Sequence, residues 1–172
     1  SEEEFRALPI QEQAKYLKLL DLELVTLKSQ KLRNYKPYGK QEEFHTSDAK
    51  TRAIFGGNRT GKTTAGGMEF LFHITGFYPD WYPQENRLKG LVMGRIIATD
   101  LQKGVGEVIV PFLEEWLDSS LILRKFRNPI GIPVKWTLKN GNQFDILTHE
   151  MTTEQFEGWK GHVAWFDEPP PR

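Results

Sequence analysis

A glycine-rich stretch in the first half of the chain carries the residue types that bind phosphate. Residues 53–64 read Ala-Ile-Phe-Gly-Gly-Asn-Arg-Thr-Gly-Lys-Thr-Thr and contain the pattern G-x-x-x-x-G-K-[ST], whose fixed positions are Gly56, Gly61, Lys62 and Thr63. Glycines let the backbone curl until several N–H groups converge on one phosphate, and a following helix adds the positive end of its dipole. In such a loop the lysine reaches the β- and γ-phosphates and the threonine hydroxyl binds Mg²⁺. The alternative is a structural turn between a strand and a helix, which the matching flanks make the weaker interpretation.

Two carboxylates follow an apolar run near the end of the chain. Residues 162–168 read His-Val-Ala-Trp-Phe-Asp-Glu, so Asp167 and Glu168 come directly after a predicted strand. We expect Asp167 to hold Mg²⁺, partly through water, because this ion keeps an octahedral shell of oxygen ligands. We expect Glu168 to orient or deprotonate the water that attacks the γ-phosphate. Alone this pattern is weak evidence, but together with the phosphate loop it predicts a nucleoside triphosphatase that uses ATP and Mg²⁺.

The composition limits the class of protein. The chain has 172 residues, of which 38% are hydrophobic and 27% charged, enough for one ordinary domain with a core. Its net charge is zero, so no overall basic field indicates nonspecific binding to nucleic acid. It has no cysteine, which excludes disulfides and thiolate metal sites. No run approaches eighteen apolar residues and the chain starts with the acidic stretch Ser-Glu-Glu-Glu, so we expect a cytoplasmic protein without a membrane contact.

The first part of the chain predicts one long helix over residues 9–33. Its apolar stripe is formed by Ile10, Ala14, Leu17, Leu20, Leu24 and Leu27. An ordinary packing helix is favoured over a partner-binding one. We therefore divide the chain into an amphipathic helix at 1–36 and a nucleotide-binding domain at 37–172. Gln41 lies just upstream of the phosphate loop, and its amide could pair with an adenine edge or could equally be a surface group.

The remaining elements predict an α/β fold with a mostly parallel sheet flanked by helices and an antiparallel ribbon. The expected elements are a strand before the loop at 53–55, a helix at 63–75, a packed aromatic loop at 76–83, a strand at 91–98, a helix at 105–117 broken by Pro111, a hairpin of 134–138 with 143–147, a helical piece at 153–156 and a strand at 162–166. Asn140-Gly141 is the strongest turn signal among them. The four histidines show no ligand spacing, and no Ser-His-Asp arrangement is present.

These residues resemble the ATPase domain of the large terminase subunit, the motor that pumps DNA into tailed-phage capsids. The resemblance rests on residues 56–63, on Pro37-Tyr-Gly-Lys-Gln at 37–41, and on Phe-Glu-Gly-Trp-Lys-Gly at 156–161 running into Trp-Phe-Asp-Glu-Pro-Pro at 165–170. It extends from about residue 35 onward, with the hairpin and Asp100 in the expected places. It implies a P-loop NTPase fold of the RecA-like kind, with further sheet strands, a coupling motif and a nuclease domain beyond residue 171.

The resemblance also implies roles for single residues. Gln41 would contact adenine, Lys62 the phosphates, Thr63 and Asp167 the Mg²⁺, and Glu168 the attacking water. The implied nucleotide-binding set is Gln41, Gly56, Gly57, Asn58, Arg59, Thr60, Gly61, Lys62, Thr63 and Thr64. Arg59 would sense or stabilise the γ-phosphate as a catalytic residue, although many relatives carry this arginine one position earlier. Lys160 is a weak candidate for the cation that reaches a neighbouring subunit's ATP, because an ammonium lacks the bidentate fork of arginine.

The implied function is an ATPase motor of viral DNA packaging that translocates double-stranded DNA. The implied partners are a portal protein, a small terminase subunit and further copies of the chain in a ring, in the host cytoplasm at the procapsid portal vertex. Two alternatives remain open. A superfamily-2-like helicase also uses an upstream glutamine, a phosphate loop and an Asp-Glu strand end. A nucleotide-binding assembly module would bind ATP without hydrolysing it.

Overall fold

The structure of the chain is a computed structural model that describes residues 2–151, 154 and 156–168, with residues 2–4 and 24–29 described by their backbone alone. The helices, in chain order, are α1 (Glu2–Ala7), α2 (Ile10–Arg33), α3 (Lys40–Thr46), α4 (Lys62–Thr75), the 3₁₀ turn η1 (Gln84–Asn86), the π-helix η2 (Leu101–Ile109), α5 (Val110–Trp116) and the 3₁₀ turn η3 (Ser119–Leu121). The strands are β1 (Met93–Ala98), β2 (Ile122–Arg127), β3 (Pro133–Leu138), β4 (Gln143–Thr148) and β5 (Val163–Phe166).

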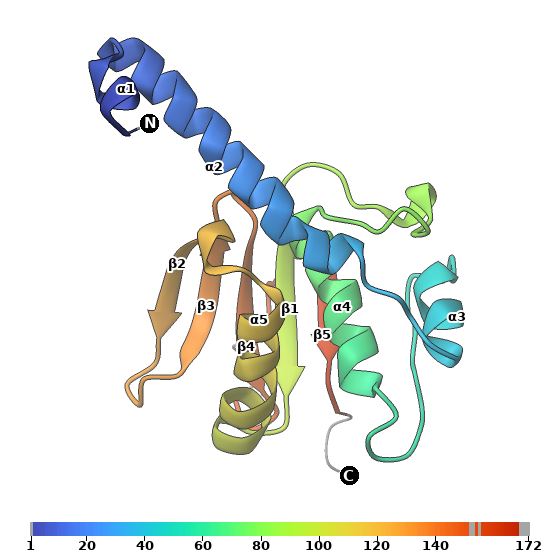
Figure 1. Cartoon of the computed structure of the whole chain (residues 1–172). Helices are drawn as coiled ribbons and strands as arrows, with labels where there is room; N and C mark the ends of the chain where they lie inside the picture. The colour runs from blue at the N-terminus through green and yellow to red at the C-terminus, as the bar shows by residue number, and fades with distance from the viewer. Residues whose placement is uncertain (1, 152–153, 155, 169–172) are drawn as a thin grey trace.

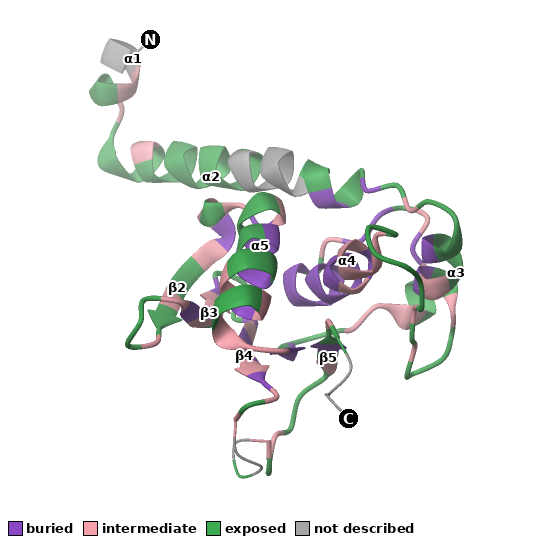
Figure 2. Ribbon diagram, turned by 90° about the horizontal axis from the view of Figure 1, so that it is seen from below, coloured by how far each residue is buried: buried purple, intermediate pink, exposed green. Residues whose placement is uncertain are grey.

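The strands form one mixed sheet in the order β2-β3-β4-β1-β5. Strand β1 pairs in parallel with β4 and with β5, whereas β3 pairs antiparallel with β2 and with β4. Figure 1 shows α2, α4 and α5 together in front of this sheet, and Figure 2 shows from below that they share one side of it. Helix α4 therefore packs on the sheet beside β5, the strand that leads to the two carboxylates.

The core lies between α4 and the central strands. Phe70, Leu71 and Ile74 of α4 are fully buried, and so is Ile96 of β1. Gly94 permits this close approach, because a Cβ there would lie 2.7 Å from side-chain atoms of both Phe70 and Ile74. Burial of these apolar side chains is the main force that fixes α4 against the sheet.

Several predictions from the sequence are confirmed. The helix after the loop spans Lys62–Thr75, with Gly61 and Gly76 in left-handed conformation at its two ends. The hairpin of β3 and β4 turns at Gly141, whose φ is 88°. The strand before the carboxylates and the packed aromatic loop, with Tyr78 and Tyr82 buried, are also present.

The expected helix at 105–117 is split near Pro111, as predicted. A π-helix ends at Ile109 and an α-helix begins at Val110, so Pro111 lies in the first turn of α5. A proline is tolerated there because the N–H groups of a first turn have no partner within the helix.

Two predictions about the sheet need correction, and one about a helical piece is not tested. The strand expected at 53–55 is wrong: residues 52–57 have no regular structure, and Phe55 is 92% exposed. β5 is the edge strand of the described sheet, and the segment at 53–55 forms no ladder with it. The sheet is not mostly parallel, because two of its four pairings are antiparallel, and β2 was not predicted. The helical piece expected at 153–156 lies partly outside the described residues.

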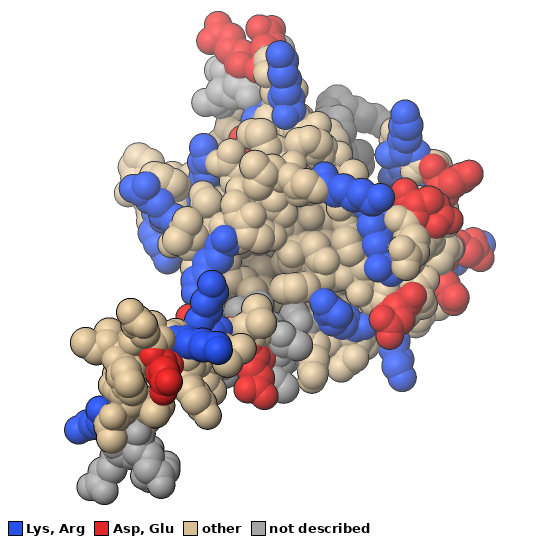
Figure 3. Space-filling view, turned by 90° about the horizontal axis from the view of Figure 1, so that it is seen from above, with Lys and Arg blue, Asp and Glu red and all other residues tan. Residues whose placement is uncertain are grey.

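Helix α2 is present as predicted, but the described part of its apolar stripe does not pack as expected, and the side chains of Leu24 and Leu27 lie outside the described residues. Ile10 is 84% exposed and Leu17 is 55% exposed, whereas Leu32 near the C-terminal end is buried. Figure 1 shows why: the helix extends away from the sheet toward the N-terminus, where its first turns contact the α1 segment, and its C-terminal end lies beside the rest of the domain. Among the described residues, no helix is long and apolar enough to cross a membrane. Figure 3 shows lysine and arginine interspersed with acidic side chains on the face seen from above, in keeping with the zero net charge.

Candidate functional site

The loop at residues 56–61 is curled. Arg59 has a φ of 63° and Gly61 a φ of 78°, so two residues adopt the left-handed region within three positions. The Thr60 hydroxyl donates a hydrogen bond of 2.9 Å to the Gly57 carbonyl and closes the turn. An L-residue pays a cost for a positive φ, and such strain is found preferentially at functional loops.

The side chain of Lys62 folds back over this loop. Its Nζ atom donates to the carbonyl oxygens of Gly56 at 2.9 Å and of Gly57 at 2.7 Å. These two contacts hold the ammonium against the first turn of the loop, at the N-terminus of α4. A positive charge and a helix N-terminus at one place together favour an anion.

The structure brings Asp167 to the same helix N-terminus. The Asp167 N–H donates to the Ile97 carbonyl at 3.1 Å, so the β5 pairing with β1 continues to the first carboxylate. Burial raises the pKa of the Asp167 carboxyl above its ordinary value, a hydrogen bond with Thr63 lowers it, the charge of Glu168 raises it and that of Lys62 lowers it. These interactions show that the phosphate loop and the carboxylate pair, about a hundred residues apart, lie together.

One oxygen of this carboxylate has no partner. Asp167 Oδ1 is buried and accepts no hydrogen bond from the protein. Such an atom is costly unless a ligand or solvent satisfies it. Glu168 is exposed, and its carbonyl oxygen lies 3.2 Å from the His149 Nε2 atom.

The other predicted loop residues are placed as follows. Asn58, Arg59 and Thr60 are exposed on the outside of the loop, and Thr64 is half-buried in the first turn of α4. Lys160 is exposed on the connection that precedes β5. The roles predicted for these residues stay predictions.

Gln41 is not a surface glutamine, and its amide makes hydrogen bonds within the chain. It is 2% exposed, and its Oε1 atom accepts from the Tyr35 hydroxyl at 3.0 Å and from the Tyr38 N–H at 3.1 Å. Its Nε2 atom donates to the Gly61 carbonyl at 3.0 Å. The amide thus joins the turn before α3 to the last glycine of the loop.

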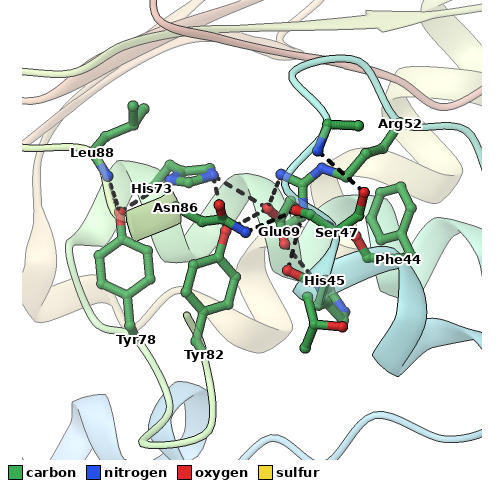
Figure 4. Close-up of polar contacts among 12 residues, drawn as sticks. Phe44, His45, Ser47, Arg52, Glu69, His73, Tyr78, Tyr82, Asn86 and Leu88 are labelled. Carbon is green, nitrogen blue, oxygen red and sulfur yellow. Dashed lines mark hydrogen bonds and ion pairs between the residues drawn. The ribbon is translucent and has the colours of Figure 1, made fainter. Parts of the chain in front are cut away.

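A buried network on α4 was not predicted from the sequence. Glu69 Oε2 lies 2.7 Å from His45 Nδ1. Glu69 Oε1 accepts hydrogen bonds from the Arg52 guanidinium and from the Tyr82 hydroxyl, the latter at 2.6 Å. The same oxygen lies 3.3 Å from His73 Nε2. Figure 4 shows these side chains converging on Glu69 from α3, from the segment before the loop and from the aromatic loop. Burial alone would raise the pKa of Glu69, but these hydrogen bonds and the Arg52 charge hold it well below its usual range.

The Glu69 network ties the entry of the phosphate loop to the helix that follows it. Arg52 lies four residues before Gly56 and also donates to the carbonyls of Phe44 at 2.9 Å and of His45 at 3.2 Å. The only sequence signal was the spacing of Glu69 and His73, which places both side chains on one face of a helix. The other partners come from distant segments, and spacing could not identify them.

Comparisons with known proteins identify the family of the chain. The family described as "Terminase large subunit, T4likevirus-type, N-terminal" matches residues 53–170. The large subunit of the terminase of Salmonella phage P22 is 26% identical over an alignment that covers 94% of this chain and 39% of the relative. No solved structure matches the chain. The chain spans about two fifths of the length of the relative that it matches. Because the family covers more than half of the chain, including both motifs, the chain belongs to the terminase large subunits and corresponds to their N-terminal part.

Proposed function

We propose that the chain forms the nucleotide site of an ATP-driven motor that packages viral DNA. The observation that carries the proposal is the meeting of Lys62, Thr63 and Asp167 at the N-terminus of α4. A cation, a hydroxyl and a carboxylate beside free backbone donors are the groups that a magnesium nucleotide requires. We assign the fold, on the same basis, to the P-loop NTPases.

The residues present fit a magnesium ion. Asp167 Oδ1 is a buried oxygen without a partner, and the Thr63 hydroxyl interacts with the same carboxylate. Hard oxygen ligands of this kind suit Mg²⁺, which keeps several waters and binds through one or two protein oxygens. When bound, the ion would neutralise charge on the β- and γ-phosphates. Thr63 and Asp167 would hold it.

The chain's own residues would act in three ways. Lys62 would exchange its carbonyl partners, Gly56 and Gly57, for phosphate oxygens and stabilise the charge that develops there. Glu168, exposed beyond the end of β5, would orient a water for attack and accept its proton. Arg59 would approach the γ-phosphate from the exposed side of the loop.

The binding step can be tested by calorimetry with Mg-ATP on the full-length protein. Lys62→Ala should remove most of the affinity, whereas Lys15→Ala, an exposed lysine of α2, should change it little. Asp167→Asn should weaken binding in the presence of Mg²⁺ more than in its absence. Equal affinity of the wild type and the Lys62→Ala variant would refute the assignment.

The motor step concerns the assembled protein. Members of a ring must place each site near a neighbour, so that a cation can stabilise the γ-phosphate charge in trans. We propose that the full-length protein acts as such a ring on a portal protein, with a small terminase subunit, in the host cytoplasm, and translocates double-stranded DNA. Any nuclease activity would lie outside this chain.

One assay separates this function from the helicase alternative. The full-length protein is given a forked duplex and, separately, empty procapsids with linear DNA. We expect ATP-dependent uptake of DNA without separation of its strands. Strand separation without uptake would favour the helicase, and nucleotide binding without turnover in the assembled complex would favour the assembly module.

A further inference from the structure

The β2–β3 ribbon, residues 122–138, lies in a segment whose charges have one sign. Residues 119–144 contain Arg124, Lys125, Arg127, Lys135 and Lys139 and no aspartate or glutamate, whereas the whole chain has 23 basic and 23 acidic residues. A local excess of this kind produces a positive field on one side of a neutral protein. The ribbon is therefore a candidate binding surface for an anionic partner.

The ribbon forms one edge of the sheet, where β2 pairs with β3 alone. Arg124 lies opposite Thr137 and Phe126 lies opposite Lys135, and residues that pair across two strands share one face. Lys125, between Arg124 and Phe126 in the chain, forms its ion pair with α5 and so points to the helix side. Arg124 and Lys135 therefore lie on the face away from the helices, and both are exposed.

The basic residues of the ribbon differ in how their charge is balanced. Within the part of the chain that the structure describes, Lys125 alone among them has an acidic partner, with its Nζ atom 2.9 Å from Glu114 Oε1. The same ammonium lies 4.0 Å from the centroid of the Trp136 ring, which is buried. The Arg124 guanidinium instead stacks 4.2 Å from the centroid of the Phe126 ring. Lys125 thus serves packing, and the charge of Arg124 faces solvent.

Arg127 and Lys135 also keep an unbalanced charge. Arg127 Nη1 donates to the Gly131 carbonyl at 2.6 Å, and a guanidinium has further N–H donors besides this one. The residue opposite Lys135 on β4 is Asp145, but Arg95 already binds both of its carboxylate oxygens, at 2.9 and 2.7 Å. Neither Arg127 nor Lys135 is therefore neutralised by an acidic residue of the described chain.

The ordinary explanation of a charged edge strand is that it prevents edge-to-edge aggregation. Exposed apolar side chains beside the charges do not fit that role: Leu123 is 66% exposed, Phe126 is 40% exposed and Ile130 is 62% exposed. Cations next to exposed apolar and aromatic groups suit a nucleic-acid backbone, because arginine and lysine donate to its phosphate oxygens.

We propose that the β2–β3 ribbon contacts the phosphate backbone of double-stranded DNA through Arg124, Arg127 and Lys135. This inference rests on the proposed packaging function, which supplies the partner. Contacts with the backbone position a duplex without reading its sequence, as a motor that moves along DNA requires.

The test measures how the full-length protein binds two short duplexes of unrelated sequence, by fluorescence anisotropy over a series of salt concentrations. The variant combines Arg124→Gln, Arg127→Gln and Lys135→Gln. Its plot of log affinity against log salt concentration should be shallower by about 2.7, because each phosphate contact contributes about 0.9 to the slope. The loss should be the same for both duplexes, and ATP-dependent uptake of DNA into procapsids should fall.

The matched control combines Lys15→Gln, Lys18→Gln and Lys89→Gln, which removes the same charge from exposed positions outside the ribbon. It should change the slope by less than about 0.9, the contribution of one phosphate contact. Both triple variants should bind Mg-ATP as tightly as the wild type, because the nucleotide site is unaltered.

Each outcome decides the proposal. An unchanged slope, or the same loss in both triple variants, would overturn it. A loss for one duplex alone would show base contacts, and lost uptake with an unchanged slope would show a protein partner; either would overturn it as well. If the triple variant does not fold, the three single substitutions, each expected to reduce the slope by about 0.9, give the decision. A wild type that neither binds duplex DNA nor takes it up would refute the packaging function itself.

Discussion

Replacing Glu69 by glutamine is the sharpest test of the packing that surrounds the phosphate loop. The side chain of Glu69 is 8% exposed and that of Arg52 is 16% exposed, so water cannot replace the lost charge. Glutamine keeps the shape but presents an NH₂ group to a site that already holds the donors of Arg52 and Tyr82. Breaking a buried charge pair in this way costs about 3 kcal/mol. For a chain of this length, that lowers the melting temperature by about 6–12 °C.

Thermal unfolding can be followed by the fluorescence of the chain's five tryptophans. The matched control is Glu107→Gln, which removes an exposed carboxylate of η2. It should shift the melting temperature by about 2 °C at most, because exposed substitutions usually change stability by less than about 0.5 kcal/mol. A Glu69→Gln shift as small as that of the control would refute the reasoning that the buried charge stabilises the fold.

The pH dependence of the same two proteins gives an independent check. The pKa of Glu69 is held below its ordinary value in the folded chain, so the unfolded chain takes up a proton first as the pH falls. Its contribution to stability is complete above about pH 5, and it is lost progressively below the ordinary carboxyl pKa of about 4.3. The stability difference between wild type and Glu69→Gln should therefore shrink on acidification from pH 6 to pH 3. A difference that stays constant over this range would contradict the assignment.

Three further predictions test the core, the packing of α2 and the carboxylate pair. Gly67→Ala should destabilise the chain by about 1–3 kcal/mol in urea unfolding, because its Cβ would lie 2.2 Å from the Phe112 ring, and a neutral result would contradict this packing. Leu32→Ala should lower the free energy of unfolding by about 2–5 kcal/mol in the same assay, whereas Leu17→Ala should lower it by less than about 0.5 kcal/mol, because Leu32 is buried and Leu17 is exposed. Equal losses would show that α2 packs differently. Glu168→Gln in the full-length protein should keep Mg-ATP binding by calorimetry and lose phosphate release, and normal turnover would exclude the role in activating water.

Local sequence patterns predicted those elements whose conformation depends on residues adjacent in the sequence. The Gly-rich run at 56–61 predicted the curled loop, because glycine readily adopts the positive φ that such a curl requires, as Gly61 does. Asn140-Gly141 predicted the hairpin, since Gly141 supplies the positive φ that the turn needs. The break near Pro111 followed from the missing N–H of proline.

Sequence alone could not decide what depends on partners far along the chain. The segment at 53–55 has the composition of a strand, but a strand also needs backbone pairing with a neighbour, and the segment forms no ladder with the edge strand β5. The stripe of α2 has helical spacing, but spacing does not reveal whether another element covers it.

The same limit applies to the site. The types and order of Lys62, Thr63, Asp167 and Glu168 came from the sequence, because each kind of chemistry requires a particular side chain. Tertiary structure decided that Thr63 and Asp167 meet, since that depends on α4 packing beside β5. It also decided that the Gln41 amide is bound to Gly61, because a hydrogen-bond partner is selected by the fold and not by spacing in the chain.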